Sequence, residues 1–202
     1  MKNEVKKVLL TCMLCIGIMS LNAQLSQHGL ILNGGLGMVD SKIDKLGEQW
    51  DDIEYKVGLS LGYRLRFNKP KPQSFHYDLD VNAGVKSVRV CNWWTNEVGH
   101  TVGGWSGGAG YHYTSIGFTA NYSLIENLSA GLGVEPVYFF KANEIRNSFD
   151  VPVVAKIAYN LKIVEVGIYG KYGLVNVFEM DYLKSGKTRE IQLSLFIPFK
   201  TK

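Results

Sequence analysis

Residues 55–67 (YKVGLSLGYRLRF) alternate without a break: every odd position is apolar, and every even position is glycine, serine or charged. A period of two predicts a β-strand whose two faces meet opposite environments. No segment after residue 23 shows the helical period of about 3.6 residues. The chain is therefore constrained to an all-β fold with one apolar and one polar sheet face.

Eight segments carry this alternation. They are predicted at 29–39, 55–67, 75–90, 111–125, 128–141, 151–159, 163–178 and 188–199. The connections after the odd-numbered segments (40–54, 91–110, 142–150 and 179–187) are all longer than those after the even-numbered ones (68–74, 126–127 and 160–162). Short turns at one end and long loops at the other are typical of up-and-down barrels in bacterial outer membranes.

The N-terminus has the pattern of a secretory signal. Lys2, Lys6 and Lys7 precede a mostly apolar run over 8–21, and Ala23 offers a small residue at the cut. The run is shorter than the roughly 20 residues that a spanning helix needs. We therefore expect residues 1–23 to be a cleaved signal peptide and 24–202 to be one barrel domain.

Removal of this signal changes the charge and the cysteine content. It takes away three lysines and one glutamate, so the formal net charge falls from +4 to +2, and only Cys91 remains. A single thiol forms neither an internal disulfide nor a zinc site alone. A net charge of +2 also gives no indication of nucleic-acid binding, which a strongly basic domain would suggest. We expect no cofactor and no bound metal.

Alternation alone does not say which face is inside. A soluble, exported lipocalin-type barrel has the same period with its apolar face inward. Glycines on the polar face favour a crowded interior there: Gly58, Gly62, Gly84, Gly117, Gly131, Gly133 and Gly167. Aromatic residues near strand ends favour interfacial girdles: Tyr55, Phe67, Phe75, Tyr77, Tyr138, Phe140 and Phe199. These features predict an eight-stranded antiparallel transmembrane β-barrel, with the lipocalin-like barrel as an alternative.

The signal ending in Ala-Gln, the eight alternating segments and the final REIQLSLFIPF resemble small outer-membrane barrels related to the OmpA transmembrane domain and OmpX. The likeness is nearest to the outer membrane protein β-barrel domain proteins of Bacteroidetes. It implies a monomer among outer-membrane lipids, folded by the barrel assembly machinery, with periplasmic termini and extracellular long loops. Such barrels usually end on an aromatic residue, whereas here Phe199 is followed by three more residues.

The polar faces predict a charged interior. Its charged members, expected to form a lumen ion-pair network, are Lys56, Arg64, Arg66, Asp78, Asp80, Lys86, Glu135, Lys156, Glu165, Lys171 and Glu190. Buried charges must be paired, because an unpaired one costs several kcal/mol. Eight strands enclose just enough space for side chains. We therefore expect a lumen plugged by these side chains.

Catalysis is not expected. His76 and Asp78 share a strand face and Ser60 could lie on the neighbouring strand, but all three face the predicted lumen, where no lipid reaches. A satisfied interior histidine is the simpler interpretation. His100 and His112 lack the carboxylate or thiolate partners of a metal site.

The longest connections suggest recognition. The first (DSKIDKLGEQWDDIE) is strongly acidic, and the second holds Trp93, Trp94 and Trp105 among glycines. Tryptophans anchor binding at interfaces, although an interfacial aromatic belt also explains them. The sequence thus favours a structural or surface-interaction barrel binding an extracellular surface or ligand. A narrow channel or a conduit for lipophilic molecules is the alternative.

Overall fold

The computed structural model of the protein describes residues 25–43, 49–95, 101–140, 147–177 and 183–199. Within these ranges, only the backbone is described for 38–43, 49–56, 88–95, 101–109 and 183–185. The predicted signal peptide lies outside the described residues. Among the residues that are described, no helix is long and apolar enough to cross a membrane.

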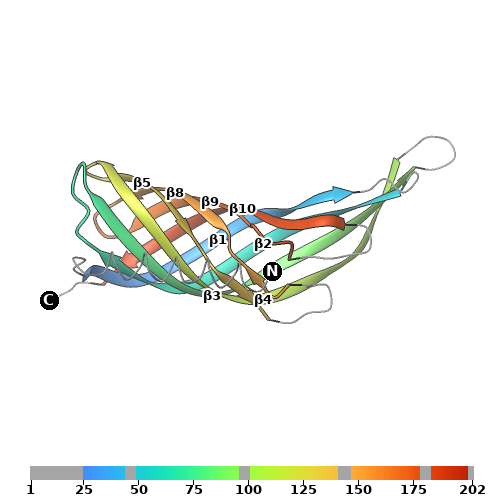
Figure 1. The fold of residues 1–202 in the computed structure, drawn as a ribbon, viewed down its shortest axis with the longest axis horizontal. Helices are drawn as coiled ribbons and strands as arrows, with labels where there is room; N and C mark the ends of the chain where they lie inside the picture. Colours follow the sequence, from blue (N-terminus) through green and yellow to red (C-terminus); the bar gives the residue numbers. More distant parts are fainter. Residues whose placement is uncertain (1–24, 44–48, 96–100, 141–146, 178–182, 200–202) are drawn as a thin grey trace, which may run out of the picture.

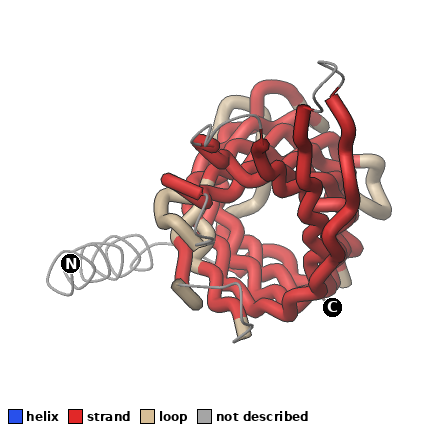
Figure 2. Tube along the Cα trace, turned by 90° about the vertical axis from the view of Figure 1, so that its right-hand side faces the viewer, coloured by secondary structure: helices blue, strands red, loops and turns tan. Residues whose placement is uncertain are grey.

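The described chain is a closed antiparallel barrel (Figures 1 and 2). Its strands are β1 Leu25–Ile43, β2 Gln49–Phe67, β3 Phe75–Thr95, β4 Thr101–Ile125, β5 Leu128–Val134, β6 Val137–Phe139, β7 Phe149–Asp150, β8 Val153–Asn160, β9 Glu165–Tyr172 and β10 Leu183–Pro198. The chain runs up and down: β1 pairs with β2, β2 with β3, β3 with β4, β4 with both β5 and β6, β5 with β8, β6 with β7, β8 with β9 and β9 with β10. β10 pairs with β1 to close the ring. The predicted fold class is confirmed.

Two prolines explain why eight barrel strands are divided into ten. Pro136 separates β5 from β6 and Pro152 separates β7 from β8, and proline has no N–H to give to a ladder. The proline carbonyls still accept hydrogen bonds: Ile116 N–H donates to Pro136 at 3.0 Å, and Glu135 N–H donates to Pro152 at 2.9 Å. The fifth and sixth barrel strands are therefore continuous in path but interrupted in hydrogen bonding.

The apolar faces point outward. Leu61, Ile116, Leu132, Ile157 and Ile191 are each more than half exposed. The residues between them face the interior and are buried, most of them polar. A lipocalin-like barrel has the reverse arrangement, with its apolar face inward. The apolar interior that this alternative predicts is therefore wrong.

The predicted long loops are wrong in extent. Residues 40–54 and 91–110 mostly continue the strands, leaving only 44–48 and 96–100 between them. The connections 44–48 and 96–100 are both shorter than the connection 68–74. The prediction that every odd-numbered connection is longer than every even-numbered one is therefore wrong. Ladder hydrogen bonds need only the backbone, so strands continue without an alternating sequence where neither face meets an apolar medium. Figure 1 shows the extended strands of β1 to β4 projecting past the rest of the barrel.

The ladder between β2 and β3 has one irregularity, where Tyr55 pairs with Val88 and Val57 pairs with Ser87. One extra residue, Lys56, therefore stands in β2 opposite that step, which defines a β-bulge.

The seventh strand is shorter than predicted. It ends at Tyr172 rather than at Phe178, and the chain that follows bends against the buried carboxylate of Asp150. Asp150 Oδ1 accepts the N–H groups of Leu174 at 3.2 Å and Val175 at 3.0 Å, and Thr188 Oγ1 donates to Oδ2 at 3.0 Å. A Cβ on Gly173 would overlap both the Asp150 carboxylate and the Thr188 hydroxyl, so only glycine fits there.

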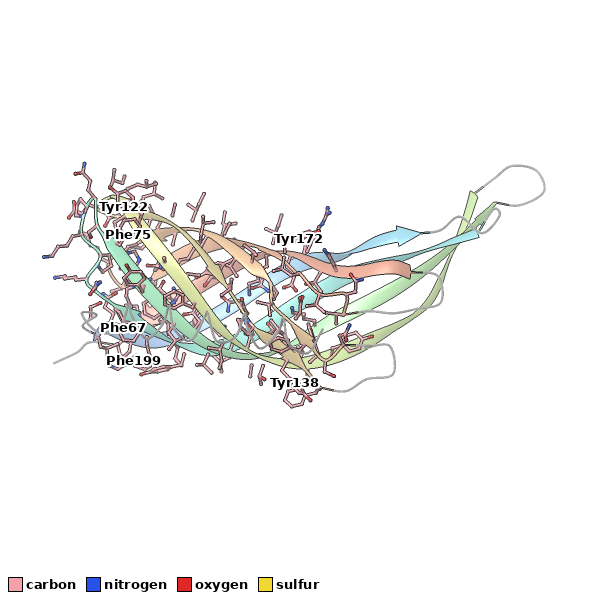
Figure 3. All side chains as sticks on the ribbon, viewed as in Figure 1. Phe67, Phe75, Tyr122, Tyr138, Tyr172 and Phe199 are labelled. Carbon is pink, nitrogen blue, oxygen red and sulfur yellow. The ribbon has the colours of Figure 1, made fainter. Side chains whose placement is uncertain are left out.

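Aromatic side chains gather at the two limits of the exposed apolar surface. Figure 3 shows Phe67, Phe75, Tyr122 and Phe199 around one end of the barrel, with Tyr138 and Tyr172 on the outer surface farther along. The short connections and both described ends of the chain lie at the first end, because Leu25 pairs with Phe67 and Gly29 pairs with Pro198.

Candidate functional site

The first charged cluster starts from the ladder between β2 and β3. Its register sets Arg64 opposite Asp80 and Arg66 opposite Asp78, with all four side chains directed inward. Arg64 Nε and Nη2 each lie 2.7 Å from one carboxylate oxygen of Asp80. Arg66 binds Asp78 in the same two-pronged way, at 2.6 and 3.0 Å. Such paired, charge-assisted hydrogen bonds fix the plane of each guanidinium group.

Two side chains from the opposite wall complete this cluster. Glu165 on β9 accepts from Arg66 Nη1 at 2.7 Å and from Arg64 Nη1 at 3.1 Å. Lys156 on β8 donates to Asp78 Oδ2 at 2.6 Å. By the shorter way round the ring, β1 and β10 lie between β2 and β9, and β4 and β5 lie between β3 and β8. The ion pairs therefore cross the lumen.

The first cluster is balanced in charge and buried. Three cations meet three carboxylates, and each of the six residues is less than a tenth exposed. Two aromatic residues that the sequence analysis missed support it. The Phe196 ring centroid lies 5.0 Å from Arg64 Cζ and 5.1 Å from Arg66 Cζ, and Arg64 Nη2 donates to the Tyr169 hydroxyl at 2.5 Å. Both aromatics occupy inward positions of their strands, which the strand phase alone could have indicated.

The second charged cluster lies farther from the short connections. Lys86 on β3 pairs with Glu190 on β10, and Lys171 on β9 pairs with Glu135 at 2.5 Å. Ser115 donates to Glu135 at 2.7 Å. This cluster, too, holds equal numbers of positive and negative groups.

Aromatic rings and neutral amides surround the second cluster. Lys86 Nζ lies 4.6 Å from the ring centroid of Tyr113 and 5.2 Å from that of Phe139, a separation at which a cation is attracted to a ring face. Between the two clusters lies an uncharged layer in which Asn33 donates to Ser60 at 3.0 Å. The interior thus consists of two balanced ionic layers separated by neutral polar groups.

The two clusters contain ten of the eleven residues predicted for the lumen network. The remaining one, Lys56, lies at the bulge in β2, and its side chain is outside the described residues. The chemistry of the clusters is that of fixed, mutually neutralising charges rather than of a reactive group.

The serine, histidine and aspartate considered for catalysis are not brought together. Ser60 pairs across the ladder with Gly84, eight positions along β3 from His76. His76 instead contacts the Ser123 hydroxyl, with Oγ 3.3 Å from Nδ1. Asp78 is occupied by Arg66 and Lys156. His76 is 1% exposed, and its Nε2 has no hydrogen-bond partner in the described structure.

The three tryptophans of the expected recognition loop lie on strands. Trp93 pairs with Gly103 and with Trp50, and Trp105 pairs with Cys91. All belong to the extended parts of β2, β3 and β4, where the structure describes the backbone only. The surface they occupy is therefore a twisted ribbon rather than a loop.

Within the described ranges, no group of three or more histidine, cysteine, aspartate or glutamate side chains has an arrangement that could hold a metal ion.

Comparisons with known proteins give distant structural similarity only. The sequence matches no known protein family and no curated protein. The solved structures similar to this chain include the outer membrane protein OprG of Pseudomonas aeruginosa, at 13% identity and a TM-score of 0.39, covering 87% of this chain and 95% of OprG. The NanC porin is similar at 8% identity and a TM-score of 0.34, covering 83% of this chain and 98% of NanC. Similarity at this level assigns neither a family nor a function, and the resemblance to OmpA and OmpX stays a prediction.

Proposed function

We propose that the chain is an integral protein of a bacterial outer membrane, crossing it with eight strands and acting through the surface beyond it. The observation that carries the proposal is the inverted barrel, apolar outside and ionic inside. Burying exposed apolar surface contributes about 25 cal/mol per Å² removed from water, and no part of the described chain covers this surface. A lipid bilayer supplies that cover around the whole circumference.

The height of the apolar surface supports this environment. On β3 the outward apolar residues run from Phe75 to Val85. Ten residues at about 3.4 Å each, tilted by about 40°, span about 26 Å. The apolar band of outer-membrane barrels is about 25 Å tall.

The interior favours a closed barrel over a pore. The first cluster fills the cross-section between β2, β3, β8 and β9 with six paired, buried side chains. A hydrated ion crossing this layer would have to separate charges that are already neutralised, and opening a buried pair costs several kcal/mol. We therefore propose a structural or surface-interaction role and no steady solute conduction. No catalytic activity is proposed.

The projecting ribbons of β1 to β4 are the proposed contact surface. They extend the barrel past its apolar band, and the stretch that includes Trp93, Trp94 and Trp105 has the aromatic and glycine content of an adaptable binding surface. In the proposed orientation these ribbons lie outside the cell, while the termini and the short connections face the periplasm. The protein is proposed to act as a monomer inserted by the barrel assembly machinery.

Location and orientation are tested together in cells expressing the protein. An epitope inserted within 96–100 is expected to be detected on intact cells, whereas one inserted after Lys71 needs permeabilised cells. The membrane fraction should contain a band whose gel mobility shifts on boiling. A soluble, unshifted band would contradict membrane insertion, and the reverse epitope pattern would contradict the orientation.

The recognition role is tested by replacing Trp93, Trp94 and Trp105 with alanine together. Adhesion of the cells to a host or neighbouring-cell surface is expected to fall while the heat-shifted band persists. Phe140→Ala serves as the control for loss of an exposed aromatic side chain outside the projecting ribbons. Unchanged adhesion of the triple variant would contradict recognition by these three residues.

A further inference from the structure

The outward face of β8, β9, β10 and β1 is hollowed. A groove of about 820 Å³ lies there, and among the residues that line it are Gly34, Leu36, Ala155, Gly170, Tyr172 and Ile191. Small residues form its floor: Gly170 pairs with Ala155, and a Cβ added to Gly170 would meet no atom within 4 Å. Larger residues stand beside it, since Ile191 pairs with Gly170 on one side and with Leu36 on the other.

A second groove continues the first. It measures about 600 Å³, shares Gly34 and Leu193 with the first, and extends over β2 and β3 to Leu59 and Ala83. Both grooves lie within the exposed apolar band. Together they form one trough, whose chemistry fits hydrocarbon chains rather than water or a polar ligand.

Positive charge marks one end of the trough. Arg189 pairs directly with Tyr172 across the β9–β10 ladder, one row beyond Ile191 and Gly170. Arg189 Cζ lies 5.3 Å and Lys187 Nζ 5.8 Å from the Tyr172 ring centroid. This end is the far one from the short connections, so in the proposed orientation it lies at the outer leaflet. Outward cations at the edge of the apolar band meet the headgroup layer.

We propose that this trough binds a phosphorylated, multiply acylated lipid of the outer leaflet, of the lipid A type. The phosphate lies against Lys187 and Arg189, and the acyl chains lie along Gly170, Ala155 and Gly34. Charge complementarity at one end and an apolar hollow within the band select this occupant over a soluble ligand. The proposal rests on the membrane location and orientation proposed above.

Two separate variants test the two halves of the site. Lys187→Ala with Arg189→Ala removes the cations, and Gly170→Leu fills the floor of the groove. Their controls are Lys69→Ala, an exposed cation at the other end of the barrel, and Ala120→Leu, an enlarged outward residue on β4, away from the trough. The folded barrel is placed in phosphatidylcholine nanodiscs containing lipid A, and retained lipid is counted by native mass spectrometry.

The expected result is retention of lipid A by the wild-type protein and by both controls. The double cation variant should bind about 25-fold more weakly, at about fivefold for each cation near the headgroup layer. The groove variant should lose retention even though its charges are intact. Nanodiscs containing phosphatidylglycerol in place of lipid A form the second arm.

Three outcomes would overturn the proposal: no retention by the folded wild-type barrel, retention by both variants equal to that of the wild-type protein, or retention of phosphatidylglycerol in preference to lipid A. Failure of the proposed function has a different signature, because a chain that is not a membrane barrel neither enters nanodiscs nor shows the heat-dependent gel shift. The two proposals are therefore distinguishable in one preparation.

Discussion

Lys156 on β8 reaches across the barrel to Asp78 on β3, with Nζ 2.6 Å from Oδ2. Arg66 holds the other side of the same carboxylate at 2.6 Å. Asp78 is thus the point at which the ladder pairs of β2 and β3 become a connection between opposite walls, and it is fully buried.

Replacing Asp78 with alanine should therefore be costly. The change leaves Lys156 and Arg66 with only Glu165 to share, and removing one partner of a buried pair typically costs about 3–5 kcal/mol. We expect the free energy of unfolding in detergent micelles to fall by about that amount in a urea titration. The control is Asn160→Ala, a polar residue at the end of β8 and outside the cluster. An unchanged unfolding midpoint would contradict the claim that the Asp78 carboxylate stabilises the barrel.

The pair Lys171–Glu135 offers a double-mutant cycle in the second cluster. Glu135→Gln alone leaves a buried ammonium group unpaired, and Lys171→Met alone leaves a buried carboxylate. The double variant removes both charges, so it should be more stable than the sum of the single effects predicts, by about 1–3 kcal/mol. Additive single effects in the same urea titration would mean that the two residues do not depend on each other.

The substitution Leu132→Lys distinguishes a membrane-inserted barrel from a soluble one. Leu132 is 67% exposed and lies near the middle of the apolar band on β5. In a phosphatidylcholine bilayer, Leu132→Lys should cost about 2–4 kcal/mol, whereas Ile163→Lys, in the turn at the edge of the band, should cost about 0–1 kcal/mol. Reversible unfolding from vesicles measures both. Equal and small costs would contradict a lipid environment around β5.

Asp150→Ala tests the turn that ends the seventh barrel strand. Without the carboxylate, the N–H groups of Leu174 and Val175 and the Thr188 hydroxyl lose their acceptor. Each of these groups that stays buried without a partner lowers the free energy of unfolding by about 1–3 kcal/mol. We expect faster proteolytic cutting within 173–177 while the rest of the barrel stays resistant. A cleavage pattern identical to that of the wild-type protein would mean that Asp150 does not hold this segment.

The sequence was sufficient for the fold because strand phase is a local property. The alternation in residues 55–67 sets Arg64 and Arg66 on one face, and the register then brings them opposite Asp80 and Asp78. The contacts across the lumen depend on barrel closure instead. Neither Lys156–Asp78 nor the place of Phe196 beside the arginines follows from any single strand.

Strand ends were the least predictable part. Outside the band the chain need not alternate, so β3 and β4 continue through the glycine-rich stretch that was expected to form a loop. Conversely, apolar residues after Tyr172 suggested a longer seventh strand, but the nonlocal acceptor Asp150 bends the backbone there. The outward groove could not be predicted either, because it depends on small residues of β1, β8 and β9 that barrel closure brings near one another.

The central claim is that paired side chains close the lumen, and single-channel recording in planar bilayers tests it most directly. The wild-type barrel should show no steady openings, while the variant Arg64→Ala, Arg66→Ala, Lys156→Ala, which removes every cation of the first cluster, should conduct. Steady large openings of the wild-type protein, indistinguishable from those of the triple variant, would contradict the account.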